Sequence, residues 1–257
     1  SMRSDHDDTE IPDPIRTLAR AARRITVLTG AGMSAESGVP TFRDAQTGLW
    51  TQIDPEDLAT PAAWHRDKAY VNAWFLWRVH LVASASPHAG HRALVVWSER
   101  PSTELRVVTQ NIDDLHERAG SDVLAHVHGS LFAWRCDRCE HPAPTPSAPP
   151  EPHQRIEPDA CPHCAGGHIR PGVVWFNEPL PEREFADAIR VCRDADLVLI
   201  VGTSGVVQPA ASLPHLAGAR GIPVVEIDPH PTEFSPFATH VWRATAGTAL
   251  PALVAAL

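Results

Sequence analysis

The sequence lacks long hydrophobic runs and an excess of basic charge, and it has almost no lysine. No apolar stretch approaches the roughly 18 residues of a membrane-spanning helix. The chain carries 22 basic and 31 acidic residues, which gives a net charge of −9 with neutral histidines. This balance argues against a protein whose main task is to hold nucleic-acid phosphates, because that task needs a basic surface. Lys68 is the single lysine of the chain.

We expect no secretory signal in the N-terminal region. Residues 1–14 are polar and acidic, without the basic and apolar regions of a signal peptide, and we expect a disordered tail there. A chain of 257 residues buries enough surface for a stable core without covalent cross-links. We therefore expect a cytoplasmic monomer that contacts neither membranes nor nucleic acid.

Four of the five cysteines form two C-x-x-C pairs, Cys136 with Cys139 and Cys161 with Cys164. In a long chain without a signal, this pattern is typical of a zinc site rather than a disulfide framework. Zinc binds four thiolates in a tetrahedron, and the sequence shows no open ligand position, so we expect one structural Zn²⁺ ion. Two redox pairs are the alternative, but the strand-then-helix context of a thioredoxin-like motif is missing. Cys192 lies on one face of a predicted helix and is expected to be a small buried hydrophobe.

Apolar strands alternate with helical patterns along the chain. The predicted strands cover residues 25–28, 105–109, 123–128, 197–202 and 224–227, and the predicted helices include 15–24, 70–83 and 182–193. Continuous Val, Ile and Leu strands between helices predict a parallel sheet covered on both faces. The expected fold class is therefore α/β, a Rossmann-like doubly wound parallel sheet.

Two insertions interrupt this predicted domain, which we assign to residues 15–44, 91–130 and 172–257. Residues 45–90 form a helical module, in which most tryptophans are expected to pack as a core. Residues 131–171 form a zinc-binding module. Within that module, residues 141–158 contain seven prolines and are expected to be an extended linker or a disordered flap.

Polar turns follow four of the predicted strands, and three of these turns contain glycine. These turns are TGAGMS (29–34), TQNIDDLH (109–116), HGS (128–130) and GTSGVVQP (202–209). Ligands of a parallel α/β sheet bind beyond the carboxyl ends of the strands, so the four turns describe one crevice. The glycines of the first turn allow a backbone to approach a pyrophosphate, although such a turn alone is equally consistent with a simple tight turn.

Five motifs occur along the chain in the order GAGMSAESGVPTFR, TQNIDDLH, HGS, the paired C-x-x-C and GTS. Together they resemble the sirtuin family of NAD-dependent protein lysine deacylases. The resemblance covers about residues 15–257. DLATP (57–61), GHRAL (90–94), RPGVVWF (170–176) and GTSGVVQPAA make the chain most similar to the class III, desuccinylase-type bacterial branch. The resemblance implies removal of acyl groups from lysines of protein or peptide substrates, with release of nicotinamide and O-acyl-ADP-ribose.

The resemblance also implies how the co-substrate NAD is held. The residues that match the family's NAD-binding motifs are Gly30, Ala31, Gly32, Ser34, Phe42, Arg43, Gln110, Asn111, Ile112, Asp113, His128, Gly202, Thr203, Ser204, Asp228 and Ala246. Asp228 stands where the family often has Asn, and a carboxylate can still accept a hydrogen bond from a ribose hydroxyl. Asn111 and Asp113 are expected to be needed for turnover because they place the nicotinamide amide.

His128 of HGS matches the family's catalytic histidine. In the mechanism that the resemblance implies, the amide oxygen of an acyl-lysine attacks C1′ of the nicotinamide ribose, and His128 acts as general base through the ribose hydroxyls. The ordinary pKa of histidine, about 6.5, suits a base that works near neutral pH.

A substrate site is implied as well. Its residues are Ala59, Phe75, Arg78, Val173, Val174, Trp175 and Phe176. The last four match a segment that pairs with the substrate peptide as an added strand. Ala59 matches a small pocket residue, and Arg78 matches the arginine of a Tyr-x-x-Arg pair that holds an acidic acyl carboxylate. Phe75 replaces the tyrosine, so we expect succinyl- and malonyl-lysine to be weaker substrates than with the tyrosine, beside measurable deacetylation.

Other interpretations stay open. Arg78 can be an ordinary helix surface residue, in which case the enzyme is a deacetylase or a long-chain deacylase without acidic preference. Mono-ADP-ribosyl transfer, an NAD dehydrogenase and a zinc-ribbon nucleic-acid-binding module are the remaining functions. The other histidines, His116 among them, are expected at the surface, because 15 are more than one site uses.

Overall fold

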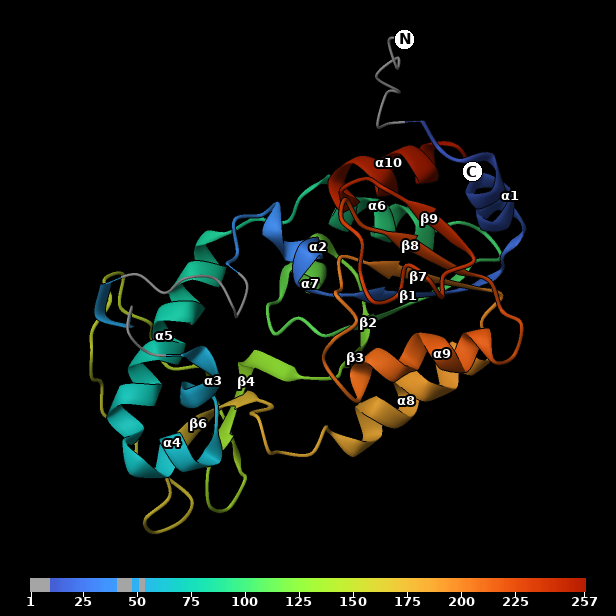
Figure 1. Cartoon of the computed structure of the whole chain (residues 1–257). Coiled ribbons are helices and arrows are strands. Elements are labelled where there is room, and N and C mark those ends of the chain that lie inside the picture. Colours follow the sequence, from blue (N-terminus) through green and yellow to red (C-terminus); the bar gives the residue numbers. More distant parts are fainter. Residues whose placement is uncertain (1–9, 41–47, 51–53) are drawn as a thin grey trace.

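A large domain and a small module build the molecule, with the small module at the left of Figure 1. The computed structural model describes residues 10–40, 48–50 and 54–257. The large domain is a six-stranded parallel sheet with helices, and the small module joins four helices to a three-stranded antiparallel sheet. The predicted Rossmann-like doubly wound fold is confirmed.

The large domain's sheet has the strand order β3-β2-β1-β7-β8-β9. Its strands are β1 (Arg24–Thr29), β2 (Glu104–Thr109), β3 (Val123–His126), β7 (Leu197–Val201), β8 (Val224–Ile227) and β9 (His240–Trp242). Every neighbouring pair is parallel, so the carboxyl ends of all six strands meet at one edge. The order reverses direction next to β1, and such a switch point opens a crevice between the turns after the strands.

Helices cover both faces of this sheet, as Figure 1 shows for α6 and α10 on one side and α8 and α9 on the other. The covering helices are α1 (Asp13–Ala21), α6 (Ala89–Ser98), α8 (Glu182–Arg193), α9 (Leu213–Gly218) and α10 (Ala246–Ala255). In β7, Leu197 and Leu199 face the core beneath α1, α6 and α10, whereas Val198 and Ile200 face α8 and α9. Alternating side chains of one strand thus fill two cores, which is why the strand is apolar throughout. Cys192 is buried in the second of these cores, as predicted.

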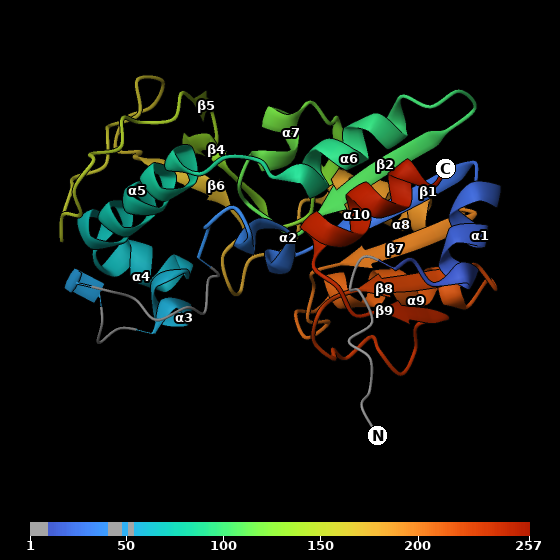
Figure 2. The same ribbon diagram turned by 90° about the horizontal axis from the view of Figure 1, so that it is seen from above.

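The small module has its own core, separate from those of the large domain. Its elements are η1 (Gly48–Trp50), α3 (Pro55–Leu58), α4 (Pro61–Arg66), α5 (Lys68–Ser84), β4 (Gly129–Cys136), β5 (Pro142–Ala143) and β6 (Ile169–Val173). Trp64, Trp74 and Phe75 are almost fully buried there, so the tryptophans do form the core of the helical insertion. Figure 2 shows α4 and α5 beside the β4–β6 sheet.

The proline-rich segment follows an extended path along α5 (Figure 2). Ile156 donates its N–H to the carbonyl of Ala69 at 3.0 Å, and its own carbonyl accepts from Asn72 Nδ2 at 2.9 Å. Of the two alternatives for residues 141–158, the extended one describes this segment.

Most element boundaries lie close to the predicted ones, with two informative differences. The predicted strand 123–128 ends at His126, because the chain turns at residues 127–128 and enters β4 through Gly129 with a φ of +77°. At the N-terminus, residues 1–9 lie outside the described residues, whereas Ile11 is buried and α1 already begins at Asp13. No helix in the described part of the chain has the length and apolar character of a membrane span.

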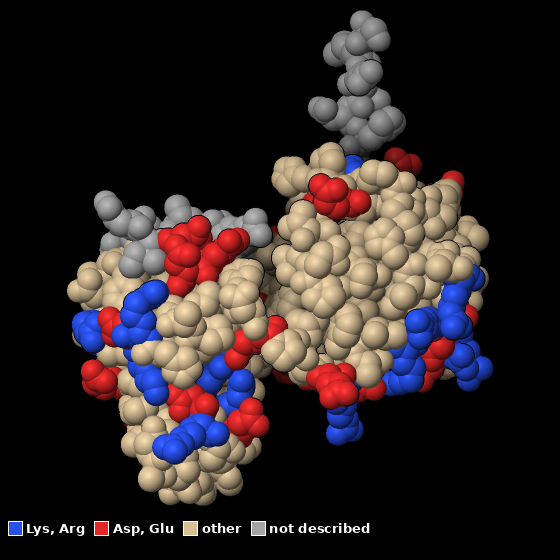
Figure 3. All heavy atoms as spheres, turned by 60° about the horizontal axis from the view of Figure 1, so that its bottom comes forward, with Lys and Arg blue, Asp and Glu red and all other residues tan. Residues whose placement is uncertain are grey.

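The remaining short helices lie near the carboxyl edge of the sheet or in its loops. They are α2 (Ala31–Ala35), α7 (Leu115–Ala119) and η2 (Ala210–Ser212). On the face drawn in Figure 3, basic and acidic side chains are interspersed over the small module.

Candidate functional site

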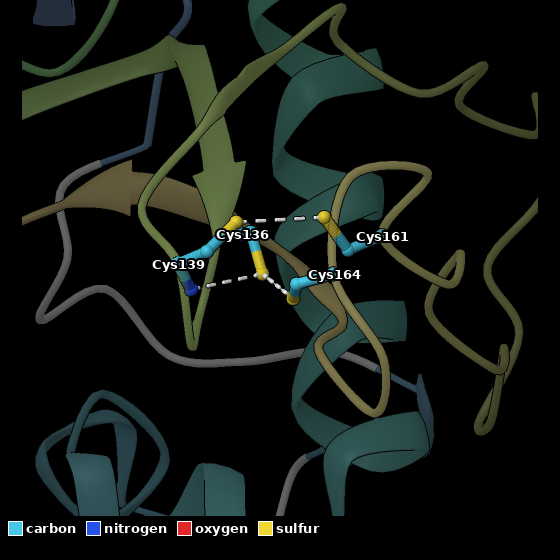
Figure 4. Close-up of side chains that lie close together, drawn as sticks. All are labelled: Cys136, Cys139, Cys161 and Cys164. Carbon is cyan, nitrogen blue, oxygen red and sulfur yellow. Dashed lines mark hydrogen bonds between the residues drawn. The ribbon is translucent and has the colours of Figure 1, made fainter.

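The four paired cysteines converge at the end of β4 in the small module (Figure 4). All four Sγ atoms lie within 4.8 Å of one another. The Sγ atoms of Cys136 and Cys164 are 3.6 Å apart, and those of Cys139 and Cys161 are 3.7 Å apart. Tetrahedral zinc with Zn–S bonds of about 2.3 Å separates its sulfur ligands by roughly 3.8 Å. The donor set and its spacing therefore fit one Zn²⁺ ion.

The backbone around the cluster is shaped for thiolates. The N–H groups of Arg138 and His163 point at the Sγ atoms of Cys136 and Cys161, each at 3.3 Å. Gly167 closes the site, because a Cβ atom there would lie 2.3 Å from the Sγ of Cys136. In the described part of the chain the cluster consists of these four cysteines, and four thiolates without a further ligand fit a structural role for the metal.

Two glycine-containing turns meet at the carboxyl edge of the large sheet. Gly32 donates its N–H to the carbonyl of Gly202 at 2.8 Å. A Cβ atom at Gly30 would lie 2.6 Å from the Cβ of Thr203, and one at Gly32 would lie 2.7 Å from the Cα of Gly202. Gly202 itself has a φ of +66°. These glycines are thus required because the turn after β1 lies too close to the turn after β7 to leave room for a Cβ atom.

A buried polar network lies beside the first turn. The Ser34 hydroxyl donates to Asp113 Oδ2 at 2.6 Å and accepts from Asn111 Nδ2 at 3.1 Å. Asn111 Nδ2 also donates to the carbonyl of Gly30 at 2.9 Å. Burial raises the pKa of Asp113, although the hydrogen bonds from Ser34 and from the Leu115 N–H work in the opposite direction. The network joins α2 to the loop after β2 and fixes both amide and carboxyl groups.

His128 lies in the turn between β3 and β4, where the large domain meets the small module. Burial lowers the pKa of His128, and a hydrogen bond to the backbone of Gln110 only partly offsets this. The His128 carbonyl accepts from the N–H of Val174 at 2.9 Å, which ties this turn to the segment after β6. The imidazole is therefore neutral over most of the pH range in which a general base works.

One cavity of about 230 Å³ brings much of the predicted site together. The predicted residues that line it are Ala31, Ser34, Ala59, Arg78, Gln110, Asn111, Ile112, Asp113, His128, Val173, Val174 and Phe176. A neighbouring cavity of about 750 Å³ is lined by His128, Val174, Trp175 and Phe176 among the predicted residues. His128 thus lies where the two cavities adjoin.

The two residues of the predicted acyl pair occupy different environments. Arg78 lines the cavity, donates to the carbonyl of Pro40 at 3.3 Å, and has its guanidinium carbon 4.9 Å from the ring centroid of Trp74. Phe75 is fully buried in the small-module core, with its ring centroid 4.7 Å from that of Trp74 and 6.0 Å from that of Trp175. The structure therefore places Phe75 behind the wall of this cavity, whereas Trp175 lines the neighbouring cavity of about 750 Å³.

The residues predicted for the adenosine side form a second group around the β7 turn. The carbonyl of Ser204 accepts from the N–H of Glu233 at 3.1 Å, which holds the turn near the end of β8. Asp228 follows β8 directly, and burial raises its pKa. Ala246 is the buried first residue of α10. Phe42 and Arg43 lie outside the described residues.

The family assignment rests on the stretch that carries these features. The profile of the Sir2 family matches residues 30–209, which include the β1 turn, the cavity residues and all four clustered cysteines. The chain belongs to the Sir2 family. The predicted resemblance to sirtuins is thereby confirmed.

Sir2-family relatives match nearly the whole chain. It is 52% identical over 239 residues to the NAD-dependent protein deacylase 2 of Corynebacterium efficiens, covering 92% of this chain and 94% of the relative. It is 51% identical over 233 residues to an NAD-dependent protein deacylase of Mycobacterium tuberculosis, covering 90% and 96%. A crystal structure of a Sir2 homolog–NAD complex superimposes with a TM-score of 0.87 at 40% identity, covering 97% of this chain and 95% of that one.

Sequence reasoning missed a buried histidine cluster in this Sir2-family chain. His91 and His116 are almost fully buried, with ring centroids 5.1 Å apart, so the expectation of surface histidines is wrong for both. His116 Nε2 is 2.9 Å from Thr29 Oγ1, and His88 Nε2 donates to the carbonyl of Met33 at 2.7 Å. No local signal in the sequence points to this cluster, because it forms by the packing of α6 against α7, and His88 is not of a residue type that typically marks a helix start.

Proposed function

We propose that this protein is an NAD-dependent protein lysine deacylase that removes succinyl and malonyl groups, and also acetyl groups. The single observation that carries the proposal is the cavity that holds Arg78 and Ala59 together with Asn111, Asp113 and His128. The names of the relatives in Corynebacterium and Mycobacterium support the deacylase activity. The acidic acyl preference rests on Arg78.

In this proposal the network of Ser34, Asn111 and Asp113 orients the nicotinamide end of NAD. Asn111 donates its two Nδ2 hydrogens within the network, to the Gly30 carbonyl and to Ser34 Oγ, so Asn111 and Asp113 are held in fixed positions where their oxygens would accept from the nicotinamide NH₂ group. NAD, when bound, supplies C1′ of its nicotinamide ribose as the electrophile for the amide oxygen of an acyl-lysine. His128, held neutral by burial, accepts a proton from a ribose hydroxyl at the junction of the two cavities. The buried walls exclude water from this point.

The peptide would bind along residues 173–176. In the described part of the small module, β6 is the edge strand of the β5-β4-β6 sheet and ends at Val173, and residues 174–176 continue it along the two cavities, where an added strand would bind. Val174 and Phe176 line both cavities, whereas Trp175 between them lines the larger one and packs its side chain, which is 2% exposed, in the small-module core. This alternation anchors the segment on one side and leaves the other for substrate.

Arg78 would bind the carboxylate of the acyl group. Among the described residues that line the cavity, Arg78 is the one with a permanent positive charge. The wall of the cavity also includes the apolar residues Leu81, Val82 and Leu131. A guanidinium in an apolar wall gains most from an anionic partner, because a charge-assisted hydrogen bond there competes with little water. Such a bond contributes about 1.5–3 kcal/mol.

The decisive experiment combines wild-type enzyme with NAD and matched succinyl-, malonyl- and acetyl-lysine peptides, followed by mass spectrometry. We expect free nicotinamide, the deacylated peptide and O-acyl-ADP-ribose. Arg78→Met should lower kcat/KM for the succinyl peptide by roughly 10- to 100-fold and largely spare the acetyl peptide.

Arg118→Met is the matched control. Arg118 donates to the carbonyls of Val82 and Ala85 at the end of the same helix α5 and is not among the cavity-lining residues described. Its loss should leave the succinyl-to-acetyl ratio unchanged. An unchanged ratio in Arg78→Met would contradict the acidic preference and leave a deacetylase or long-chain deacylase, and labelled NAD transferred to protein would instead indicate ADP-ribosyl transfer.

A further inference from the structure

The single lysine of the chain forms an ion pair with the loop between Cys136 and Cys139, which we call the zinc loop. Lys68 begins α5, and its Nζ lies 2.8 Å from Asp137 Oδ2 and 3.0 Å from His168 Nδ1. The side chain of Asp137 is only 8% exposed and that of Lys68 25%. This ion pair is therefore better shielded from water than a surface pair, and the loss of one partner leaves the other charge poorly solvated.

Asp137 receives two further hydrogen bonds. It lies between Cys136 and Cys139, so its backbone is part of the loop that carries two thiols. Its Oδ2 accepts from Trp64 Nε1 at 2.8 Å, and its Oδ1 accepts from the N–H of His168 at 2.9 Å. One carboxylate thus joins the zinc loop to α4 and to the start of α5.

Trp64 connects Asp137 to the proposed peptide segment 173–176, because it packs against Trp175. Its ring centroid lies 5.6 Å from that of Trp175, which is 2% exposed. The Arg170 guanidinium carbon lies 3.6 Å from the centroid of the Trp175 ring, and Glu178 accepts from both Arg170 and the N–H of Trp175. The Trp175 side chain is therefore held from several directions, and it sets the backbone between Val174 and Phe176.

The space around these residues allows the arrangement to shift. A cavity of about 180 Å³ is lined by Trp64, Asp137, Arg170, Trp175 and Glu178, among others. Without the carboxylate of Asp137, the Trp64 ring can move into this space, and Trp175 loses one of its supports. Asn111 and Ser34, by contrast, are held by hydrogen bonds to each other and to the turn after β1 of the large domain.

We propose that Lys68 and Asp137 are positioning residues for the substrate, which fix the peptide-binding segment 173–176 through Trp64 and Trp175. The proposal rests on the proposed deacylase function. The zinc loop is then a rigid support against which the peptide segment is aligned. Changes at Lys68 or Asp137 should weaken peptide binding and leave NAD binding unchanged.

The test compares Lys68→Met and Asp137→Asn with the control Arg155→Met. Arg155 pairs with Asp67, the residue before Lys68, at the exposed outer side of the module. For each variant, zinc content, the KM values for acyl-lysine peptide and NAD, and backbone hydrogen exchange of residues 173–176 are measured. We expect one zinc per chain throughout, and in the two test variants a peptide KM about tenfold higher with an unchanged KM for NAD.

Hydrogen exchange at residues 173–176 should be faster in Lys68→Met and Asp137→Asn and unchanged in Arg155→Met. Lys68→Arg, which keeps the positive charge, should restore most of the peptide KM. An unchanged peptide KM in both test variants, an equal rise in both KM values, or zinc loss in Lys68→Met would overturn the proposal. If the wild-type enzyme deacylates no peptide, the proposed function fails, while hydrogen exchange still decides whether the ion pair holds the segment.

Discussion

At the scale of single residues, burial decides the chemistry of His128. The imidazole lies between two cavities, and its surroundings lower its pKa from the ordinary value of 6.5. Burial disfavours the charged imidazolium, so the neutral form that can accept a proton persists to lower pH. A rate that depends on neutral His128 should rise as pH increases through this lowered pKa and then stay level.

We therefore predict an acidic limb of kcat/KM with a midpoint below pH 6.5. His128→Ala should keep the fold and NAD binding, lower turnover by ~10²–10⁴-fold, and lose the acidic limb from its residual activity. The measurements are pH–rate profiles of both proteins and NAD titration by calorimetry. Near wild-type turnover in His128→Ala, or an acidic limb that persists in it, would show that another group is the base.

At the scale of secondary structure elements, the start of α6 joins this helix to α2 after β1 and to α7 after β2, through His88 with Met33 and His91 with His116. His88 accepts from the N–H of Gly90, and His91 Nδ1 accepts from the N–H of His88, as in a capping box. Burial, followed by the nearby His116, lowers the pKa of His91 to about 2, and burial lowers that of His116 to about 4. Both rings are therefore neutral in the folded protein.

This cluster predicts acid sensitivity. Below pH 6.5 the unfolded chain binds protons at these histidines before the folded protein does, so the free energy of unfolding falls as pH decreases. His91→Gln keeps a capping side chain but cannot titrate in this range. When the pH is lowered from 6.5 to 5, the free energy of unfolding measured in urea should fall in both proteins. The fall should be about 1.5 kcal/mol smaller in His91→Gln than in the wild type. His65→Gln, at an exposed position of α4, should follow the wild-type pH dependence; equal slopes in all three proteins would contradict the prediction.

At the scale of the whole molecule, the large domain and the small module are each stabilised by hydrophobic cores of their own. The small-module core contains Cys136 and Cys161 beside Trp64, Trp74 and Trp175, whereas the large domain packs around two other clusters. Loss of the metal should therefore affect the small module first. The glycine-containing turns of the large domain depend instead on the contacts between the turn after β1 and the turn after β7.

Cys161→Ala should abolish zinc binding and lower the melting temperature of the small module by roughly 10 °C or more, because structural zinc contributes directly to folding. Tryptophan fluorescence reports this transition, and NAD binding reports the large domain. Cys192→Ala, which removes a buried thiol outside the cluster, should keep one zinc per chain. A zinc-free Cys161→Ala protein with wild-type melting would rule out a structural role for the metal.

The sequence by itself determined the features that depend on local patterns. Apolar strands between helices specify a parallel sheet, and paired C-x-x-C spacing brings two thiols to the same side of each loop. Turns after parallel strands must meet at one edge, so Asn111, Asp113 and His128 could be placed near one another from the chain alone. These inferences need only strand direction and short spacings.

Only the tertiary structure decided which neighbours in sequence become neighbours in the site. Phe75 and Arg78 are one turn apart on α5, yet Phe75 packs into the core and Arg78 lines the cavity. Lys68 meets Asp137 across 69 positions of sequence, and His91 packs on His116 from another helix. Such contacts depend on how the two modules and their helices pack, and packing is set by the whole set of buried side chains rather than by any local pattern.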